Sequence, residues 1–100
     1  MSAEFLPDAY AEFLEAAAFY EQRQVGLGEQ FIEAVERAVG DAETNPRRWP
    51  RFARRTRRRL IGRFPYGLIY LETRAGILVV AVMHLHRHPR YWVGRLKKKP

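Results

Sequence analysis

The stretch DAYAEFLEAAAFYEQRQVGLGEQFIEAVERAVGDAETN, residues 8–45, decides the fold. Its first half predicts a helix over residues 8–24, because apolar side chains recur at helical spacing on one face: Tyr10, Phe13, Leu14, Ala17 and Tyr20. Gly26-Leu27-Gly28 interrupts the repeat, and glycine readily adopts the left-handed conformation that ends helices. A second helical repeat runs from Phe31 to Ala42 and stops at Asn45-Pro46. The stretch therefore predicts an αα-hairpin, two helices joined by a short loop.

The sequence on either side of this hairpin predicts a sheet. Residues 3–6 are expected to form a short strand that Pro7 stops, because proline lacks the N–H of a central strand. After Pro46 the pattern changes to short runs rich in β-branched and aromatic residues, which indicate strands over residues 57–62, 66–73 and 77–86. Residues 74–76 read as a tight hairpin loop, and residues 91–96 as a last helical turn.

The expected architecture is α+β, with the αα-hairpin packed on a three- to four-stranded antiparallel sheet. The length fits one domain over residues 1–96, followed by a basic tail at residues 97–100. The chain has no cysteine, which excludes disulfides, thiolate metal sites and cysteine nucleophiles and suits a reducing cytoplasm. The first residues lack the pattern of a signal peptide, and the longest apolar run, residues 76–83, is too short to span a bilayer. We expect a cytoplasmic protein with no membrane association and no cofactor.

The two halves of the chain carry opposite charge. Residues 1–45 hold two arginines against ten acidic residues, a net charge of −8, whereas residues 46–100 hold sixteen basic residues against Glu72 alone, a net charge of +15. The basic half needs an anionic neighbour, which is nucleic acid, an acidic protein, or the acidic half of the same chain. The sequence alone leaves these three open.

The first candidate site is the basic segment from Arg47 to Arg63, which contains nine arginines with Trp49 and Phe52 between them. Guanidinium groups bind phosphate through paired hydrogen bonds, and aromatic rings stack on bases, so this composition is typical of a nucleic-acid surface. The alternative is a solvated loop and edge strand whose charge discourages edge pairing. We expect the segment to contact an anionic partner.

The second candidate site is HLHRHPRYW, residues 84–92. His84 and His86 lie on one face of a strand and are candidates for acid–base chemistry on RNA, with Arg87 stabilising charge on phosphorus. Tyr91 is a candidate for stacking or proton transfer, or else closes the core together with Trp92. A metal site is not expected, because no acidic residue lies nearby in the sequence to complete the ligands. The competing interpretation makes these side chains local packing and binding groups.

The ordered set of these features resembles the RelE/ParE toxin family. The resemblance is carried by Tyr20, Gly26-Leu27-Gly28 and Phe31 in the hairpin, followed by Pro46, Trp49-Pro50, Arg57-Arg58-Arg59, Phe64-Pro65-Tyr66, Tyr70, His84, Arg87, Pro89 and Trp92. It implies a toxin of a type II toxin–antitoxin system, of the kind also described as plasmid stabilisation proteins. A cognate antitoxin would wrap along the toxin and neutralise it in a hetero-oligomer.

Two targets follow from this resemblance. RelE-like members cut mRNA on the ribosome with basic residues and a C-terminal Tyr or His, whereas ParE-like members bind DNA gyrase without cutting RNA. The catalytic candidates are His84, His86, Arg87 and Tyr91, and the candidates for binding nucleic acid or the target are Arg57, Arg58, Arg59, Arg63 and Arg90. The resemblance implies functional roles for Arg58, Arg63, Arg87 and Tyr91 among them. The central strands lack the lysines that several ribonucleases of the family use. A third reading, from charge alone, is a non-toxic nucleic-acid-binding module.

Overall fold

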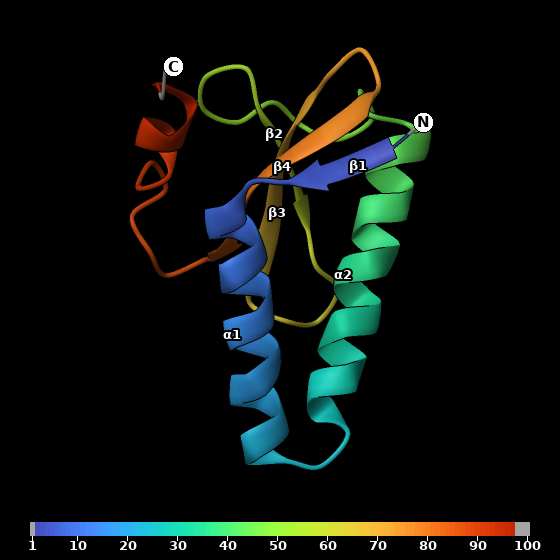
Figure 1. Ribbon diagram of the computed structural model, residues 1–100, viewed down its shortest axis with the longest axis vertical. Coiled ribbons are helices and arrows are strands. Elements are labelled where there is room, and N and C mark those ends of the chain that lie inside the picture. The colour runs from blue at the N-terminus through green and yellow to red at the C-terminus, as the bar shows by residue number, and fades with distance from the viewer. Residues whose placement is uncertain (1, 98–100) are drawn as a thin grey trace.

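Two α-helices and a four-stranded sheet form the main body of the part of the chain that the structure describes (Figure 1). The computed structural model describes residues 2–97. The elements follow in the order β1 (Ser2–Phe5), α1 (Pro7–Arg23), α2 (Leu27–Thr44), β2 (Arg57–Leu60), β3 (Tyr66–Glu72), β4 (Gly76–His84) and the 3₁₀ helix η1 (Val93–Lys97). Every predicted helix and strand is present. The strand expected over residues 77–86 ends at His84, and residues 98–100 of the expected basic tail lie outside the described residues.

The sheet has the strand order β1-β4-β3-β2 and is mixed. β2, β3 and β4 form the expected antiparallel meander, but β1 pairs with β4 in parallel, so the expectation of an antiparallel sheet holds for three of the four strands. The parallel pairing follows from the crossover, because α1 and α2 separate β1 from the meander and return the chain to the far side of the sheet. Sequential strand patterns carry no signal for such a long-range partner.

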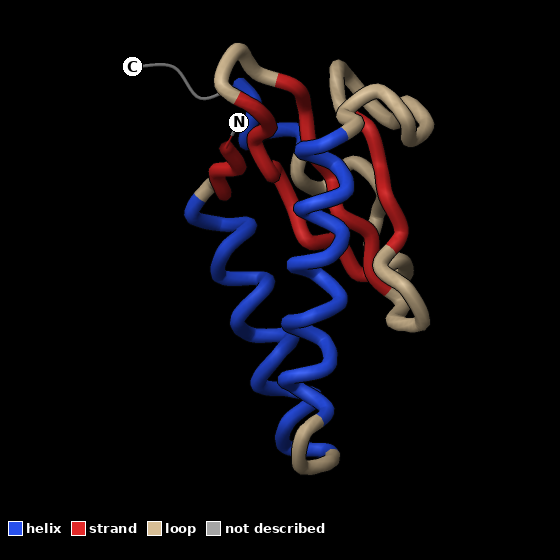
Figure 2. The backbone as a smooth tube through the Cα atoms, turned by 90° about the vertical axis from the view of Figure 1, so that its right-hand side faces the viewer, coloured by secondary structure: helices blue, strands red, loops and turns tan. Residues whose placement is uncertain are grey.

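One face of the sheet packs against both helices (Figures 1 and 2). α1 buries Ala9, Phe13, Ala16 and Ala17 against this face, and α2 buries Phe31, Val35, Ala38 and Ala42. The face predicted for α1 is rotated in the structure: Tyr10 and Leu14, expected to be buried, remain 49% and 47% exposed. Alanines take the central positions instead, which lets the helix approach the sheet closely.

The opposite face of the sheet is covered by two segments without regular α or β structure. The loop after α2 contributes Phe52 and Ala53, and the C-terminal segment contributes Tyr91, Trp92, Val93 and Leu96. Trp92 is fully buried on Ile69, Leu71, Val80, Ala81 and Met83, and its ring stacks with Phe52 at a centroid distance of 6.1 Å. Both faces of β4 are therefore buried, as its continuous apolar sequence predicts.

A β-bulge in β4 changes which backbone groups point to the side of β1. The register with β3 skips Val80, because Tyr70 pairs with Val79 and Ile69 with Ala81. Before the bulge, the Val79 carbonyl accepts a hydrogen bond from Leu6 N–H, at the end of β1. After it, the Val80 carbonyl and the Val82 N–H point toward the side that β1 no longer covers. Side chains of α1 and the C-terminal segment satisfy both groups, and this is where the candidate site lies.

Among residues 2–97, no helix is both long and apolar enough to cross a membrane.

Candidate functional site

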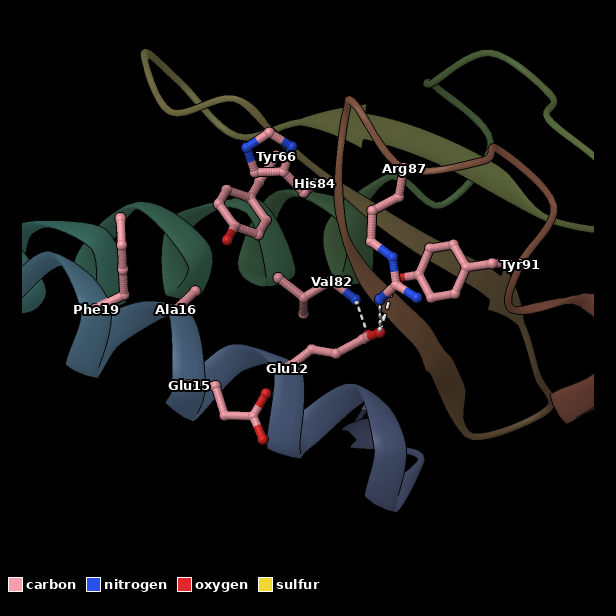
Figure 3. A pocket seen from close by; sticks show the side chains of 9 residues that line it. All are labelled: Glu12, Glu15, Ala16, Phe19, Tyr66, Val82, His84, Arg87 and Tyr91. Atoms are coloured by element: carbon pink, nitrogen blue, oxygen red, sulfur yellow. Dashed lines mark hydrogen bonds and ion pairs between the residues drawn. The ribbon is translucent and has the colours of Figure 1, made fainter.

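A cavity of about 260 Å³ lies where α1 crosses the end of β4 (Figure 3). α1 contributes Glu12, Glu15, Ala16 and Phe19, while the sheet and the segment after it contribute Tyr66, Val82, His84, Arg87 and Tyr91. Three of the four catalytic candidates from the sequence, His84, Arg87 and Tyr91, line this cavity. His86 is exposed and does not line it.

Glu12 is the centre of the polar contacts at this cavity. One carboxylate oxygen accepts hydrogen bonds from Val82 N–H at 3.0 Å and from Arg95 Nη1 at 3.0 Å. The other accepts from the Tyr91 hydroxyl at 2.7 Å, with Arg87 Nη1 at 3.8 Å (Figure 3). The same oxygen also accepts from Arg95 Nη2 at 2.7 Å. The Glu12 and Arg95 side chains are only 15% and 17% exposed. A single carboxylate thus joins α1, the open edge of β4 and the C-terminal segment.

Two guanidinium groups lie near the ring of Tyr91. Arg87 Cζ lies 3.7 Å from the centre of its ring, and Arg95 Cζ lies at 5.2 Å. Burial, followed by the hydrogen bond to Glu12, raises the pKa of the Tyr91 hydroxyl well above 10. The hydroxyl is therefore a firmly protonated donor to Glu12 rather than a base. To act as a base, the hydroxyl would first have to lose its proton, and that proton is already hydrogen-bonded to the Glu12 carboxylate.

Arg95 completes this cluster from η1. It donates to the Val80 carbonyl at 2.9 Å and lies 3.7 Å from Asp8. The hydrogen bonds to Glu12 raise the pKa of Arg95, which keeps it cationic at any working pH. The residue thereby satisfies the β4 backbone group that the bulge leaves without a strand partner.

The two histidines lie next to each other at the end of β4, although the strand on which both were expected ends at His84 and His86 lies in the turn that follows. Their ring centroids are 5.0 Å apart, and His84 Nδ1 accepts a hydrogen bond from the His86 N–H at 3.1 Å. In the neutral ring of His84 the proton is therefore on Nε2. The Tyr66 ring packs edge-on against His84, with the ring centroids 5.0 Å apart. Of the pair, only His84 adjoins the cavity.

The arginines expected to form one binding surface are separated by the sheet. In β2, Arg57 and Arg59 pair with Tyr70 and Leu68 and point to the helix side, whereas Arg58 points to the opposite side. Arg57 donates to the Trp49 carbonyl at 2.8 Å, and Arg59 binds Asp41 of α2. Arg63, beyond β2, hydrogen-bonds Gln30 of α2. These three side chains form hydrogen bonds or an ion pair within the molecule. Arg58 lies over the Phe52 ring without an acidic partner among the described residues, and Arg90 is exposed.

Glu12 and Arg95 are the residues of this polar cluster that the sequence analysis did not single out. Glu12 lies at i+3 from Ala9 and i−4 from Ala16, in the middle of the stripe that α1 buries. A carboxylate at such a position requires buried donors, and this was the available signal. The burial of Glu12 was not predicted, because the apolar face expected for this helix was centred on Tyr10 and Leu14. Arg95 gives no comparable signal, since its partner is eighty-three positions away.

Chemically, the arrangement positions side chains more than it activates them. Glu12 has four donors, the Tyr91 hydroxyl is protonated, and Arg87 lies over the tyrosine ring. In the part of the chain that the structure describes, no group of three His, Cys, Asp or Glu side chains is close enough to hold a metal ion. The most accessible groups at the cavity are Glu15, which points away from Arg87, and the 55% exposed Arg87 side chain (Figure 3).

The fold and this site define a class of small α+β proteins in which a helical hairpin covers one side of a mixed sheet and charged side chains gather at the end of the last strand. Comparison with known proteins gives the family. Residues 3–89 match the family model of the ParE toxin of type II toxin–antitoxin systems, parDE. The chain therefore belongs to the ParE toxin family, within the RelE/ParE superfamily.

A solved structure supports the fold. A chain of the chromosomal ParDE toxin–antitoxin system from P. aeruginosa superimposes with a TM-score of 0.61 at 15% sequence identity, over 86% of this chain and 97% of that chain. A search of curated proteins gave no match. The family match ends before Tyr91, Trp92 and Arg95, so the C-terminal contacts to Glu12 lie outside the matched segment.

Proposed function

We propose that this type II toxin arrests bacterial growth by binding a protein target, DNA gyrase, and that it does not cut mRNA. The observation that carries the proposal is the hydrogen bond that the Tyr91 hydroxyl donates to Glu12. The guanidinium of Arg87 lies over the ring of the same tyrosine. Tyr91 is the side chain that the resemblance to RelE-like ribonucleases would make functional. Here it holds the C-terminal segment on α1.

The Tyr91 hydroxyl is unsuited to proton transfer in RNA cleavage, either as a general base or as a general acid. A general base for attack of a 2′-hydroxyl needs a pKa near the working pH, and the pKa of the Tyr91 hydroxyl is raised far from that range. A general acid needs a proton that it gives up easily, and the Tyr91 proton is bound to a carboxylate within the fold. The cluster supports a structural role for the tyrosine in an inhibitor.

The arginines give independent support. In RNA cleavage, cationic donors aimed at the phosphate would stabilise the charge that develops on it. Arg57, Arg59 and Arg63 instead contact the backbone, Asp41 and Gln30 of the same chain. Only Arg87, among the arginines proposed from the sequence, lines the cavity.

A cognate antitoxin is proposed as the partner that neutralises the protein in a toxin–antitoxin hetero-oligomer in the cytoplasm. Its proposed contacts are charge-complementary, because the basic half retains exposed arginines after the internal ion pairs are formed. If the genes for the toxin and its antitoxin lie on a plasmid, the pair would stabilise that plasmid.

The test is induced expression of the full chain in a host without the antitoxin. Growth, mapped mRNA ends and plasmid supercoiling are followed in the same culture. We expect arrest with intact mRNA and disturbed supercoiling. New mRNA ends within codons at the onset of arrest would overturn the proposal in favour of a ribosome-dependent ribonuclease.

A double variant sharpens this experiment. His84→Ala with Tyr91→Phe removes an imidazole and a hydroxyl at the cavity but keeps the tyrosine ring on which Arg87 lies. We expect the variant still to arrest growth. Loss of arrest together with loss of the mRNA ends would assign catalysis to these groups, provided that the purified variant melts as a folded protein.

A further inference from the structure

The loop between α2 and β2 contains a small hydrogen-bonded hairpin that presents arginines to solvent. Arg51 and Arg57 form an antiparallel bridge, and Phe52 N–H donates to the Thr56 carbonyl at 2.9 Å. Thr56 is fully buried and closes the turn through its N–H and hydroxyl, which both donate to the Ala53 carbonyl. Residues 53–55 form the tip. We refer to residues 51–57 as the arginine hairpin.

The arginine hairpin is anchored on the core at its base. Phe52 stacks on the buried Trp92, and Arg58 N–H donates to the Pro50 carbonyl at 3.1 Å. Figure 1 shows the loop beside the C-terminal segment, and apolar side chains of both pack on the face of the sheet away from the helices. The tip is therefore held in one place relative to the rest of the molecule.

Four guanidinium groups at this place have no anionic partner. Arg51, Arg54 and Arg55 are exposed, Arg58 is half-buried beside them, and within residues 2–97 none of the four forms a salt bridge. Arg47, Arg59 and Arg95, by contrast, each pair with a carboxylate. Like charges held together on a hydrogen-bonded turn repel one another unless an anion binds them.

Backbone geometry at the tip adds a second observation. Arg54 has φ of 60°, the left-handed conformation that side chains other than those of glycine, asparagine and aspartate rarely adopt. Glycine at this position would form the same turn without strain. The long arginine side chain of Arg54 therefore occupies a position where the backbone geometry of the turn alone would favour glycine.

The aromatic residues nearby are not free to stack on bases. Arg58 Cζ lies 4.7 Å from the Phe52 ring centre, and Trp92 stacks on the same ring. Arg48 and Arg59 each lie 5.3 Å from the centre of the Trp49 ring. Sequence reasoning treated these rings as stacking platforms, but guanidinium groups already lie over them. This disfavours a single-strand site, which depends on stacked bases.

We infer that the arginine hairpin, with Arg58, binds the phosphate backbone of a nucleic-acid duplex. An acidic protein is the competing partner, but protein interfaces centre on apolar and aromatic anchors, and the hairpin tip is Ala53-Arg54-Arg55. Backbone contacts need only exposed cations at fixed spacing. The inference concerns a surface apart from the cavity around Glu12 and is independent of how growth is arrested.

The experiment measures binding of the purified full chain to a fluorescein-labelled 20-base-pair DNA duplex by anisotropy over a series of salt concentrations. The test variant is Arg54→Gln with Arg55→Gln. The matched control is Arg23→Gln with Arg37→Gln, which removes the same charge from exposed arginines of α1 and α2. Each phosphate contact contributes about 0.9 to the slope of log K against log salt, so losing two contacts should reduce the slope of the test variant by about 1.8. We expect the control variant to keep the wild-type slope.

Further arms separate the alternatives. Arg54→Asn with Arg55→Gln repeats the test with a residue that tolerates positive φ, so a folding defect at the tip cannot imitate loss of binding. An RNA duplex of the same length shows which duplex is preferred, and tight binding of either supports the inference. Equal losses in the test and control variants, tighter binding of single strands than of duplexes, or equal affinity for poly-glutamate would overturn it.

Discussion

A carboxylate in the buried stripe of a helix is stable only when donors surround it, and Glu12 has four. Glu12→Gln replaces one oxygen by an NH₂ group that faces the donors of Arg95 and Tyr91. We expect the free energy of unfolding to fall by roughly 2–3 kcal/mol, because a mostly buried guanidinium loses its charged partner. Urea denaturation measures this.

Glu15→Gln is the matched control for Glu12→Gln. It lies one turn along the same helix, lines the same cavity and is exposed. It removes the same charge and should change stability by less than about 0.5 kcal/mol. Equal effects of the two substitutions would mean that water, rather than Glu12, satisfies Arg95 and Tyr91.

The hydroxyl of Tyr91 predicts a dependence of stability on alkaline pH. Its pKa is raised by burial and by Glu12, so above pH 10 the unfolded chain loses this proton while the folded chain keeps it. The contribution to stability is complete below pH 10 and is lost progressively above it, with a slope of up to about 1.4 kcal/mol per pH unit. Tyr91→Phe should flatten the fall in stability between about pH 10 and 11.

Urea midpoints at constant ionic strength, compared between wild type and Tyr91→Phe, check this prediction. Tyr20, Tyr66 and Tyr70 also have pKa values raised by burial, so some of the slope should remain in the variant. An identical slope in the two proteins would show that Tyr91 ionises alike in the folded and unfolded chains.

At the scale of elements, the contact between the two helices depends on a glycine. A Cβ at Gly28 would lie 2.5 Å from the Ala17 carbonyl oxygen and 2.9 Å from Glu21 Cβ, whereas a Cβ at Gly40 meets nothing within 4 Å. We expect Gly28→Ala to destabilise the fold by roughly 1–3 kcal/mol, because α1 and α2 must move apart. Gly40→Ala should stabilise it by about 0.5–1 kcal/mol, since alanine is the better helix former.

Thermal unfolding of both alanine variants tests this pair. Stabilisation by both would mean that the helices separate without cost. The contrast also shows what the sequence could predict. The GLG segment was recognised as a break between helices, and Gly26 with φ of 89° fills that role. Close approach at Gly28, which lies inside α2, depends on the partner helix and is not visible in local spacing.

The helices and strands were predictable because each has its own apolar period. Two features were not: the parallel pairing of β1 with β4, and the stacking of Phe52, from the loop after α2, on Trp92, whose place in the core the sequence did suggest. Both depend on which distant segment supplies a missing partner. The bulge at Val80 leaves no mark in the sequence either, because the residues around it are all apolar. It exposes the β4 backbone groups that Glu12 and Arg95 bind.

At the scale of the whole molecule, the division of charge noted in the sequence corresponds to two layers. The acidic half forms β1 and both helices, and the basic half forms the meander and the segments behind it. Ion pairs such as Arg59 with Asp41 and Arg95 with Glu12 join the layers. Part of the +15 charge is therefore balanced within the chain, and this explains why the three-arginine motif of β2 does not form one open surface.

This division predicts how the chain behaves when it is cut. Peptides of residues 1–45 and 46–100, with net charges of −8 and +15, should each be largely unfolded. The apolar faces of α1 and α2 pack on β3 and β4, and isolated helices of this length are marginal in water. Mixing should restore the helical circular dichroism of the intact chain. Raising salt from 50 to 500 mM should weaken the association by on the order of tenfold, because charge adds to an apolar interface. A helical signal from residues 1–45 alone that mixing leaves unchanged would contradict the prediction and would make the hairpin an independent folding unit.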